Sequence, residues 1–331
     1  MNNFLKDKKI LVTGADGFIG SHLIEELVPY GADVHAMAYY NSWNSCGWLS
    51  DIPKEIFSKI KIINADVRDS GHMNHLVPEY DYVLHLASLI AIPYSYDAPM
   101  SYVETNVIGT TNILNAAKNS KKLIRLIHTS TSEVYGTAQT VPITEDHPLV
   151  GQSPYSASKI AADKMAESFA RSFNMPIVTA RPFNTYGPRQ TARAIIPTII
   201  SQALRGNTIQ LGDLTPTRDF NFVKDTAMGF VKLLEAKGIE GDTFNIGSGR
   251  EISMQALVEL IEKILEKKME IKQDPNRIRP GKSEVFRLLA CTKKSADLTG
   301  YKPSYSLEDG LKLTIDWIRK NLHYFSDTYA K

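Results

Sequence analysis

The first half of the chain alternates short apolar stretches with longer amphipathic ones, the pattern of a parallel β-sheet covered by helices. The stretch KKILVTG opens this pattern and ends in a glycine. Strands are predicted at residues 8–14, 32–39, 60–67, 80–88, 122–130 and 175–183. Helical periodicity covers residues 18–28, 101–119 and 155–173. We therefore expect an α/β fold with a Rossmann-type, doubly wound parallel sheet.

From about residue 182 onward the pattern changes. Loops rich in Pro, Gly, Thr and Arg, such as NTYGPRQTAR and LGDLTPTRDFNFV, separate short helices. We expect one domain over residues 1–182 and, over residues 183–331, mainly a smaller mixed α/β lobe, with the chain able to cross between the two. Loops that carry arginines above the end of a sheet suit a binding site.

Composition narrows the class of protein without naming it. Of 331 residues, 43% are hydrophobic and 22% charged, and the net charge of +2 gives no electrostatic case for nucleic acid or an anionic membrane as partner. Two cysteines and scattered histidines predict neither a disulfide framework nor a metal site. The opening MNNFLKDKK lacks the apolar core of a signal peptide, and no apolar run approaches transmembrane length. We expect a cytoplasmic protein.

A glycine triplet follows the first strand. TGADGFIG places Gly14, Gly17 and Gly20 between that strand and the next helix. Glycines allow a tight turn and let backbone N–H groups approach a pyrophosphate at the helix N-terminus, where the dipole favours anions. The spacing is GxxGxxG, not the GxGxxG of ordinary dinucleotide dehydrogenases. The first domain is therefore predicted to bind NAD or NADP.

The form of the cofactor is left open by the second strand. That strand should end in an acid for the adenosine ribose of NAD, or in arginine for the 2′-phosphate of NADP. Ala38 stands near the expected place and is followed by YYNS, so neither signal is present. We favour NAD. Asp66 and Val67, after the third strand, are candidates for contact with the adenine, although a turn or N-cap aspartate explains Asp66 equally well.

The stretch PYSASK carries a candidate pair for proton transfer. Tyr155 and Lys159 are separated by four residues, which places them on one face of a helix. A phenol ordinarily loses its proton near a pKa of ~10, and a nearby ammonium favours the phenolate. Such a pair is often only a solvated helix face. Following a nucleotide-binding loop and a hydroxyl-rich strand end, it predicts a catalytic base.

Six motifs in order resemble one known family. GxxGxxG, HLAS, TNVIGT, STSEVYG, YSASK and RPFNTYGPR resemble the extended short-chain dehydrogenases/reductases that act as nucleotide-sugar epimerases and dehydratases. The similarity runs from about residue 8 to at least residue 300. It implies tightly bound, internally recycled NAD(P), a C-terminal lobe that binds a nucleotide sugar, and Tyr155 as the base for a sugar hydroxyl. It also implies a homodimer through helices near residues 101–119 and 155–173.

Carried over motif by motif, the resemblance gives a set of cofactor residues that includes the catalytic pair. They are Gly14, Gly17, Phe18, Ile19, Gly20, Asp66, Val67, Leu86, Ala87, Ser88, Asn106, Tyr155 and Lys159.

The lone glutamate of HTSTSEVYG decides which reaction we expect. In the family's 4,6-dehydratases this stretch reads Thr-Asp-Glu, where the glutamate removes the C5 proton and the aspartate protonates the leaving C6 hydroxyl. The pattern falls on Thr131, Ser132 and Glu133, so the glutamate is present and serine replaces the aspartate. We expect Glu133 to act as both base and acid, because removing a proton next to a carbonyl needs a positioned base. Thr131 resembles the hydroxyl that binds the C4 oxygen.

Four residues of the late loops resemble the family's contacts to the substrate. A guanidinium binds phosphate through two hydrogen bonds and keeps its charge at working pH. By resemblance Asn184, Arg218 and Arg279 contact the diphosphate or nucleotide, and Glu284 contacts the ribose or base.

The function that follows is a nucleotide-sugar 4,6-dehydratase. With the stretches YNSWNSCGWL and RIRPGKSEV, the serine change resembles dehydratases that act on GDP-N-acetylglucosamine in legionaminic acid biosynthesis. The alternatives are a nucleotide-sugar 4-epimerase and a UDP-N-acetylglucosamine 4,6-dehydratase, with or without inversion at C5. A non-catalytic NAD(P)-sensing protein would be expected to lack Tyr155 or Lys159.

Overall fold

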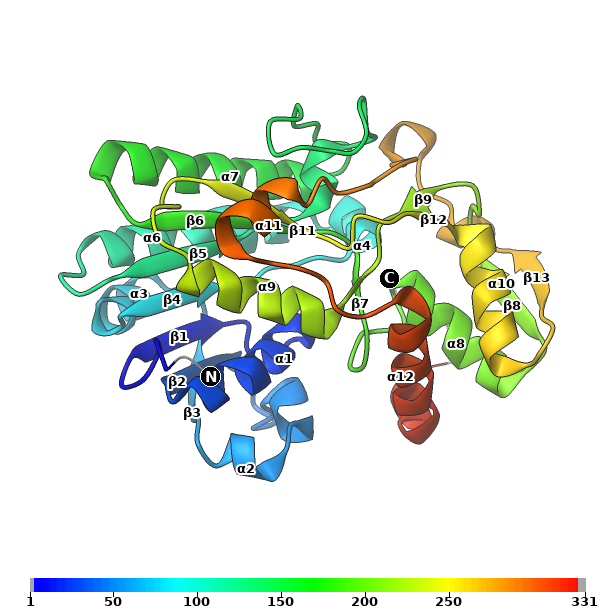
Figure 1. The fold of residues 1–331 in the computed structure, drawn as a ribbon, viewed down its shortest axis with the longest axis horizontal. Helices are drawn as coiled ribbons and strands as arrows, with labels where there is room; N and C mark the ends of the chain where they lie inside the picture. The colour runs from blue at the N-terminus through cyan, green and yellow to red at the C-terminus, as the bar shows by residue number, and fades with distance from the viewer. Residues whose placement is uncertain (1–2, 327–331) are drawn as a thin grey trace.

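A seven-stranded parallel sheet forms the centre of the protein (Figure 1), in a computed structural model that describes residues 3–326. The strand order is β11-β6-β5-β4-β1-β2-β3. The order reverses between β1 and β4, which makes their carboxyl ends the topological switch point where doubly wound sheets bind ligands. The strands are β1 (Lys9–Thr13), β2 (Asp33–Tyr39), β3 (Lys61–Ala65), β4 (Tyr82–His85), β5 (Arg125–Thr129), β6 (Ile177–Pro182) and β11 (Thr243–Ile246).

The predicted Rossmann-type fold is confirmed, with all six predicted strands in place. Residues 1–2 and 327–331 lie outside the described residues. They include the outer ends of the two predicted domains and the first two residues of MNNFLKDKK. The seventh strand, β11, comes from the second half of the chain and pairs with β6, as in Phe244 opposite Ala180. The chain therefore crosses back into the sheet after residue 183.

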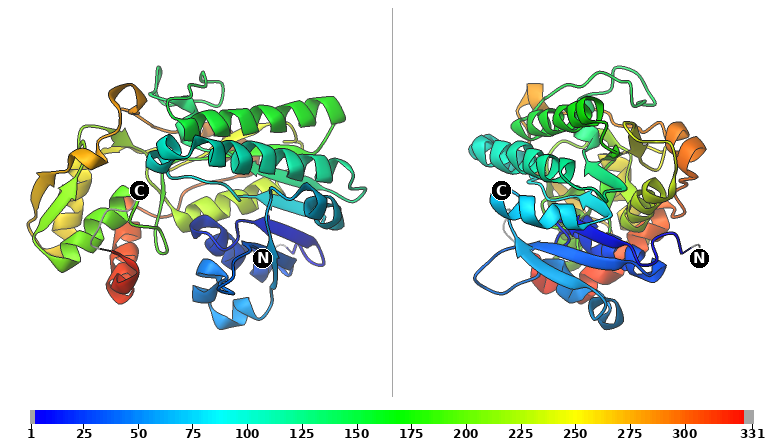
Figure 2. Two further views of the ribbon diagram at one scale, coloured as in Figure 1. Left: turned by 180° about the vertical axis from the view of Figure 1, so that it is seen from behind. Right: turned by 90° about the vertical axis from the view of Figure 1, so that its left-hand side faces the viewer.

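Helices cover both faces of the sheet because each strand is apolar on both sides. In β1, Ile10 and Val12 face one layer and Leu11 faces the other, as the two-residue period of a strand requires. Figure 2 shows α6 and α7 side by side on one side of the sheet and α9 on the other. The covering helices are α1 (Phe18–Leu27), α3 (Ser70–Leu76), α6 (Gly109–Lys118), α7 (Pro154–Phe173), α9 (Val223–Glu235) and α11 (Lys293–Thr299).

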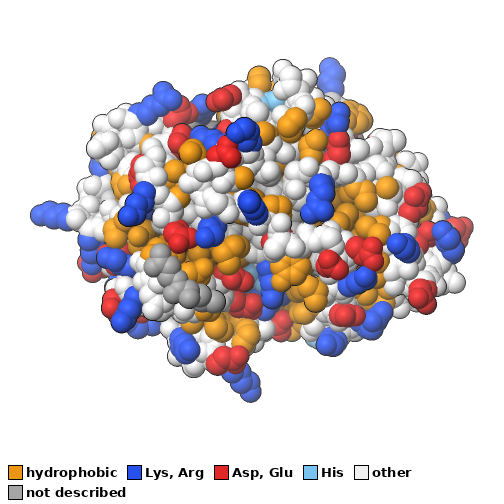
Figure 3. Space-filling view, in the orientation of Figure 1, with side chains coloured by type: hydrophobic (Ala, Val, Ile, Leu, Met, Phe, Trp, Pro, Cys, Tyr) orange, Lys and Arg blue, Asp and Glu red, His pale blue; other side chains and the backbone are white. Residues whose placement is uncertain are grey.

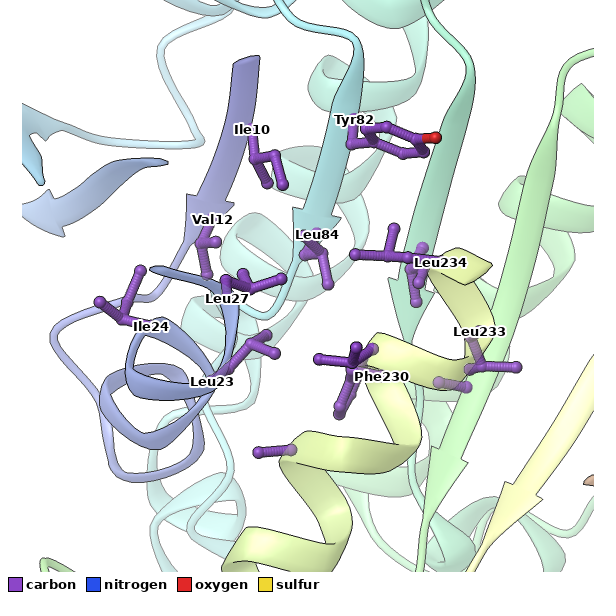
Figure 4. Close-up of a cluster of buried hydrophobic side chains, with 14 of the residues drawn as sticks. Ile10, Val12, Leu23, Ile24, Leu27, Tyr82, Leu84, Phe230, Leu233 and Leu234 are labelled. Atoms are coloured by element: carbon purple, nitrogen blue, oxygen red, sulfur yellow. The ribbon is translucent and has the colours of Figure 1, made fainter. Parts of the chain in front are cut away.

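A late segment completes the early core. Leu23 and Leu27 of α1 meet Phe230 of α9 beneath β1 and β4, and all three side chains are fully buried (Figure 4). Burying a leucine or phenylalanine side chain stabilises a fold by ~1.5–3 kcal/mol. The first domain thus needs residues from beyond position 220 to close its apolar face.

The helix predicted over residues 101–119 is wrong in one respect, because the structure divides it into three parts. These are α5 (Pro99–Tyr102), a π-helical turn η4 (Val103–Ile108) and α6. The wider turn holds Asn106, whose fully buried amide binds neighbouring segments. Such turns are frequent at functional sites.

The second lobe has its own apolar core between three helices and a two-stranded sheet. Its buried side chains include Ile199, Leu257 and Ile315. Figure 1 places it at the end of the sheet, with α12 and α10 on its outside. Its elements are α8 (Ile195–Arg205), α10 (Met254–Leu265), α12 (Leu307–Lys320), β8 (Thr208–Leu211) and β13 (Glu270–Gln273), with the two-residue strands β7 (Thr185–Tyr186), β9 (Thr217–Arg218), β10 (Asn221–Phe222) and β12 (Ile252–Ser253).

Arg189 and Trp48 are among the residues that join the lobes. The buried Arg189 donates to Ser21 and Glu25 of α1, at 3.2 and 2.5 Å. Trp48, in the 3-10 turn η2 (Gly47–Asp51), packs edge-on against Trp317 of α12 with ring centroids 5.5 Å apart. The second lobe therefore directly holds α1, the helix that follows the glycine triplet.

The surface carries charges of both signs. On the face drawn in Figure 3, acidic and basic side chains are interspersed, in keeping with the net charge of +2. Of the helices within residues 3–326, none is both long and apolar enough to cross a membrane.

Candidate active site

The glycine loop fits against the chain that follows β4. Gly14 has φ +66°, and a Cβ there would lie 2.8 Å from the Ala87 nitrogen. A Cβ on Gly20 would lie 2.2 Å from the Gly14 oxygen. The Ala87 N–H also donates to the Thr13 hydroxyl at 3.1 Å. This hydrogen bond holds the loop after β4 against the end of β1. Side chains at Gly14 and Gly20 would separate β1, α1 and the β4 loop.

The loop leaves the first turn of α1 open. Gly17 is its N-cap, and no side chain caps the helix. The N–H groups of such a first turn have no partner within the helix, and the helix dipole favours an anion there. The residues present therefore fit a pyrophosphate, with Phe18 and Ile19 in that first turn and Leu86 to Ser88 across the switch point.

Asp66 lies at the end of β3, where the sequence suggests an adenine contact. Its carboxylate accepts three hydrogen bonds from Arg68, the shortest at 2.6 Å, and these lower the pKa of Asp66. It also accepts from the Arg68 N–H at 2.9 Å, so it forms a local turn. Val67 is buried, and a Cβ on Gly109 would lie 2.7 Å from it.

Asn106 ties the β4 loop to α7. Its amide donates to the Leu89 oxygen at 3.0 Å and to the Ser158 hydroxyl at 2.9 Å, and it accepts from the Leu89 N–H at 2.8 Å. The predicted cofactor residues Leu86 to Ser88 therefore lie in a segment that is fixed at both ends. It follows β4 directly, and it precedes Leu89, which Asn106 holds.

Tyr155 and Lys159 lie in the first two turns of α7, close to the end of β5. A capping box formed by Ser153 and Ser156 starts the helix. The Lys159 ammonium donates to the Thr129 oxygen at 2.6 Å. Both members of the pair are buried, and the Tyr155 ring meets that of Tyr102 edge-on, with centroids 6.2 Å apart.

Burial dominates the electrostatics of this pair. It raises the pKa of Tyr155, against a hydrogen bond with Thr131 that lowers it. It also lowers the pKa of Lys159 to about 8, against the negative charge of Asp163. The structure thus favours the neutral phenol, and the phenolate needs the Thr131 hydroxyl and further positive charge.

Thr131, Ser132 and Glu133 follow β5 in the short turn η5 (Ser132–Tyr135). Thr131 is the N-cap of this turn, with its hydroxyl accepting from the Glu133 N–H at 3.2 Å. Ser132 and Glu133 are 2% and 8% exposed, so the glutamate is not a surface residue. The turn brings a threonine hydroxyl and a buried carboxylate to the side of Tyr155.

Glu133 begins a chain of ion pairs that joins the predicted catalytic and substrate residues. Arg279 Nη1 lies 3.7 Å from Glu133 Oε2 and 3.6 Å from Glu284 Oε1. Arg218 Nη2 donates to the same Glu284 oxygen at 3.3 Å. Burial lowers the pKa of Arg218, and Glu133 and Glu284 oppose that shift. Residues far apart in the sequence therefore form one charged cluster.

Asn184, the fourth predicted substrate residue, follows β6. Within the described part of the chain, its side-chain oxygen is buried and accepts no hydrogen bond. A buried amide oxygen without a partner is costly, so a ligand that donates to it is favoured. Arg189, in the same loop, is instead committed to the contact between the lobes.

A buried network near the site escapes a reading of the sequence alone. This network lies beneath the catalytic pair and centres on Asp163, which accepts from Ser130 and Arg181 and pairs with His128. Its spacing of four residues from Lys159 is a signal that could have found it. Nearby, His85 is a satisfied core histidine, since both of its ring nitrogens have hydroxyl partners.

Comparison with known proteins shows which proteins share this sequence and fold. The family described as GDP-mannose 4,6 dehydratase matches residues 11–314. A dTDP-glucose 4,6-dehydratase of Xanthomonas campestris is 32% identical, over 94% of this chain and 93% of its own. The solved UDP-glucuronic acid 4-epimerase of Bacillus cereus, in complex with UDP-glucuronic acid and NAD, has a TM-score of 0.86 at 31% identity and covers 95% of this chain and 99% of its own. The NAD-bound dTDP-glucose 4,6-dehydratase of Streptomyces venezuelae has a TM-score of 0.85 at 27% identity, with 96% and 98% covered.

The chain therefore belongs to the extended short-chain dehydrogenase/reductase family of nucleotide-sugar dehydratases and epimerases. Both reaction types occur among its solved relatives on the same fold, so the fold alone does not separate them.

Replacing Lys159 by methionine tests the buried ammonium. Between pH 8 and 10.5 the unfolded chain binds a proton at Lys159 that the folded protein has lost, so the stability of the wild type rises with pH in this range. Relative to Lys159→Met, we expect its free energy of unfolding to rise by about 3 kcal/mol across that window. Urea denaturation at several pH values, with matched cofactor content, measures this difference. A pH-independent difference would contradict the assignment.

Proposed function

We propose that the protein is a nucleotide-sugar 4,6-dehydratase that converts GDP-N-acetylglucosamine to its 4-keto-6-deoxy product. The observation that carries this proposal is the position of Glu133: a buried carboxylate beside the Thr131 and Tyr155 hydroxyls and paired with Arg279. A 4-epimerase needs no second base at this place, because oxidation and reduction at C4 complete its reaction.

The cofactor of the proposed reaction is tightly bound NAD. Bound there, NAD would supply the hydride acceptor for C4 and the hydride donor for C6, so no external reductant would be consumed. The glycine cradle and the open first turn of α1 fit its pyrophosphate, and the two solved relatives described above hold NAD. NADP is the alternative.

Tyr155 and Lys159 carry the first proton transfer. Tyr155 accepts the proton of the C4 hydroxyl as the C4 ketone forms. Thr131 hydrogen-bonds to the phenol and is placed to bind the C4 oxygen. Lys159, held by the Thr129 oxygen, lies one helical turn from Tyr155 and supplies positive charge on the same face of α7. Positioned acid–base groups of this kind contribute ~10²–10⁴-fold to a rate.

Glu133 then eliminates water across C5 and C6. Its carboxylate takes the C5 proton, which the C4 ketone has made acidic, and the electron pair forms the C5–C6 double bond. The same carboxyl donates that proton to the C6 hydroxyl, which leaves as water. Ser132 cannot replace an aspartic acid here, because a serine hydroxyl is a poor acid, although it can orient a water molecule. C6 then receives the hydride, and C5 takes a proton that solvent water delivers through Glu133. Tyr155 releases the proton of the C4 hydroxyl to solvent, so the net change is the loss of one water.

The ion pairs of Arg218 and Arg279 form the proposed substrate clamp. Both guanidiniums lie next to carboxylates, at 3.3 to 3.7 Å, and can exchange them for the diphosphate. Asn184 contributes its buried amide oxygen, which can accept from a hydroxyl or N–H of the nucleotide sugar, and Glu284 is then released toward the ribose or base. Binding of substrate would therefore also free Glu133 from Arg279.

The sugar and the base in this proposal rest on the resemblance of several stretches to the legionaminic acid dehydratases. UDP-N-acetylglucosamine is the alternative substrate, with or without inversion at C5. The enzyme's location in the cytoplasm stays a prediction.

We also propose a homodimer through α6, α7 and the segment before α6. Three apolar side chains in this segment are exposed: Met100 by 64%, Val103 by 38% and Ile108 by 47%. Covering such a surface is favourable. Sedimentation analysis tests this proposal, and a monomer at micromolar concentration would contradict it.

Replacing Glu133 by glutamine should separate oxidation from elimination. The variant keeps Tyr155 and Lys159, so it should still reduce its nicotinamide when substrate is added. Loss of water should slow by ~10²–10⁴-fold, because the amide cannot take a proton. Reduced nicotinamide absorbance and product mass measure the two steps. Glu259→Gln, on the exposed face of α10, is the control. Elimination at the wild-type rate in Glu133→Gln would rule out the proposed role.

Replacing Arg218 by alanine should weaken the nucleotide itself. Loss of a hydrogen bond to a charged group should raise the Kd for GDP or UDP by roughly 10–100-fold, as measured by calorimetry. Arg218→Lys should recover part of the affinity, since it keeps the charge but not the paired donors. Arg319→Ala, an exposed arginine of α12, should bind as the wild type does. Unchanged affinity in Arg218→Ala would contradict the clamp.

A further inference from the structure

The end of β2 carries no acid of its own, yet a carboxylate lies against it. Asp16, in the glycine loop, accepts the Tyr39 N–H with Oδ2 at 3.1 Å. Tyr39 is the last residue of β2, the place where doubly wound folds hold the adenosine ribose. The next backbone link is similar: the Ala15 N–H donates to the Met37 oxygen at 3.2 Å. The glycine loop therefore borders the ribose position.

The chain after β2 holds Asp16 in this place. The Trp48 N–H donates to the backbone carbonyl oxygen of Asp16 at 3.0 Å. Gly47 has φ +55°, and a Cβ there would lie 2.5 Å from that oxygen. Asp16 thus sits between the end of β2 and the turn η2. Its side chain is only partly buried, and no other residue among those described donates to Oδ1.

Burial raises the pKa of Asp16, with the Tyr39 N–H opposing that shift. The backbone N–H groups of Tyr39 and of Asp16 itself donate to this carboxylate, and a partly desolvated carboxylate gains from a further donor. A ribose hydroxyl is a donor of the right kind, whereas a 2′-phosphate has none to offer at neutral pH and repels the carboxylate.

The surrounding charges favour the same distinction. Residues 36–53 contain no lysine or arginine. Arg68, which follows β3, is a cation that contacts the end of β2: it donates to Tyr39 Oη at 3.1 Å. Its guanidinium is paired with Asp66 at 2.6 Å, so its charge is already balanced. A 2′-phosphate would have to displace Asp66 to gain this cation.

We infer that Asp16 supplies, from the glycine loop, the carboxylate that β2 lacks: it binds the adenosine ribose hydroxyls and selects NAD over NADP. Asp16 is a specificity residue with no part in the chemistry at C4 to C6. The inference rests on the cofactor-binding half of the proposed function and is independent of the sugar and the reaction.

Competition between the two cofactors tests the inference. The purified enzyme is incubated with equal concentrations of NAD and NADP until exchange is complete, and the bound nucleotide is released by denaturation and identified by mass spectrometry. The wild type should retain NAD over NADP by about 100-fold or more, since facing like charges costs several powers of ten in affinity. This readout needs no sugar nucleotide and no turnover, so it stands even if the proposed reaction fails.

The decisive variant is Asp16→Asn. Its amide oxygen can still accept the Tyr39 N–H, so the loop keeps its anchor while the charge is lost. The ratio of bound NAD to NADP should fall by roughly tenfold or more, the size expected for a hydrogen bond to a charged group. Asp33→Asn makes the same charge change at the other end of β2, about 20 Å away, and should leave the ratio unchanged.

A purely structural Asp16 gives a different result. In that case Asp16→Asn, which keeps the anchor, would have the wild-type ratio, and the inference would be wrong. A wild type that prefers NADP would also overturn it, and Arg68→Gln would then remove that preference. Thermal unfolding of each variant with saturating NAD shows whether the fold is intact, and the ratio remains measurable for any variant that retains nucleotide.

Discussion

The turn from β1 into α1 packs directly on the backbone that follows β4, and the site is arranged around this contact. It requires glycine at positions 14 and 20, because a Cβ at either would meet backbone atoms at 2.8 and 2.2 Å. Once it is made, the open first turn of α1, the β4 loop and the end of β2 border one place at the switch point. Asn106 and the second lobe's Arg189 hold the two sides of this arrangement.

A second constraint is the cost of burying charge. Glu133, Arg218 and Glu284 are largely buried. Removing one partner of a buried ion pair costs roughly 3–5 kcal/mol, because the other charge is left unpaired. The cluster is therefore stable only while its charges are matched. In the proposed mechanism, a diphosphate enters by replacing the carboxylates as the partner of the arginines. In this view, binding of the nucleotide and release of the glutamate for chemistry are one exchange of ion pairs.

Much of the fold followed from local pattern. All six early strands were predicted because apolar runs bounded by turns are a strong signal, and the glycine triplet marked the switch point. The four-residue β11 and the part of α9 in the first core could not be assigned from pattern, since pairing of strands whose residues are 64 positions apart depends on tertiary packing. The π-helical turn at Asn106 likewise has no periodic signal.

The site was foreseen in its members more than in its contacts. Tyr155, Lys159 and Glu133 were found from motifs, yet that Glu133 pairs with Arg279 depends on how a late loop folds back over the sheet. Asp16 was not predicted because the acid was expected within β2 itself. The carboxylate of Asp16 reaches the end of β2 only through the folding of the glycine loop against that strand. The raised pKa of Tyr155 also needs coordinates, because burial cannot be read from the spacing of PYSASK.

The central claim is elimination of water by the carboxylate of Glu133, and the nature of the product tests it most directly. GDP-N-acetylglucosamine and UDP-N-acetylglucosamine are each incubated with the wild-type enzyme and followed by mass spectrometry and proton NMR. The account predicts loss of one water from the GDP sugar and a new methyl signal at C6. An unchanged mass with altered sugar couplings would mean epimerisation at C4 and would contradict it.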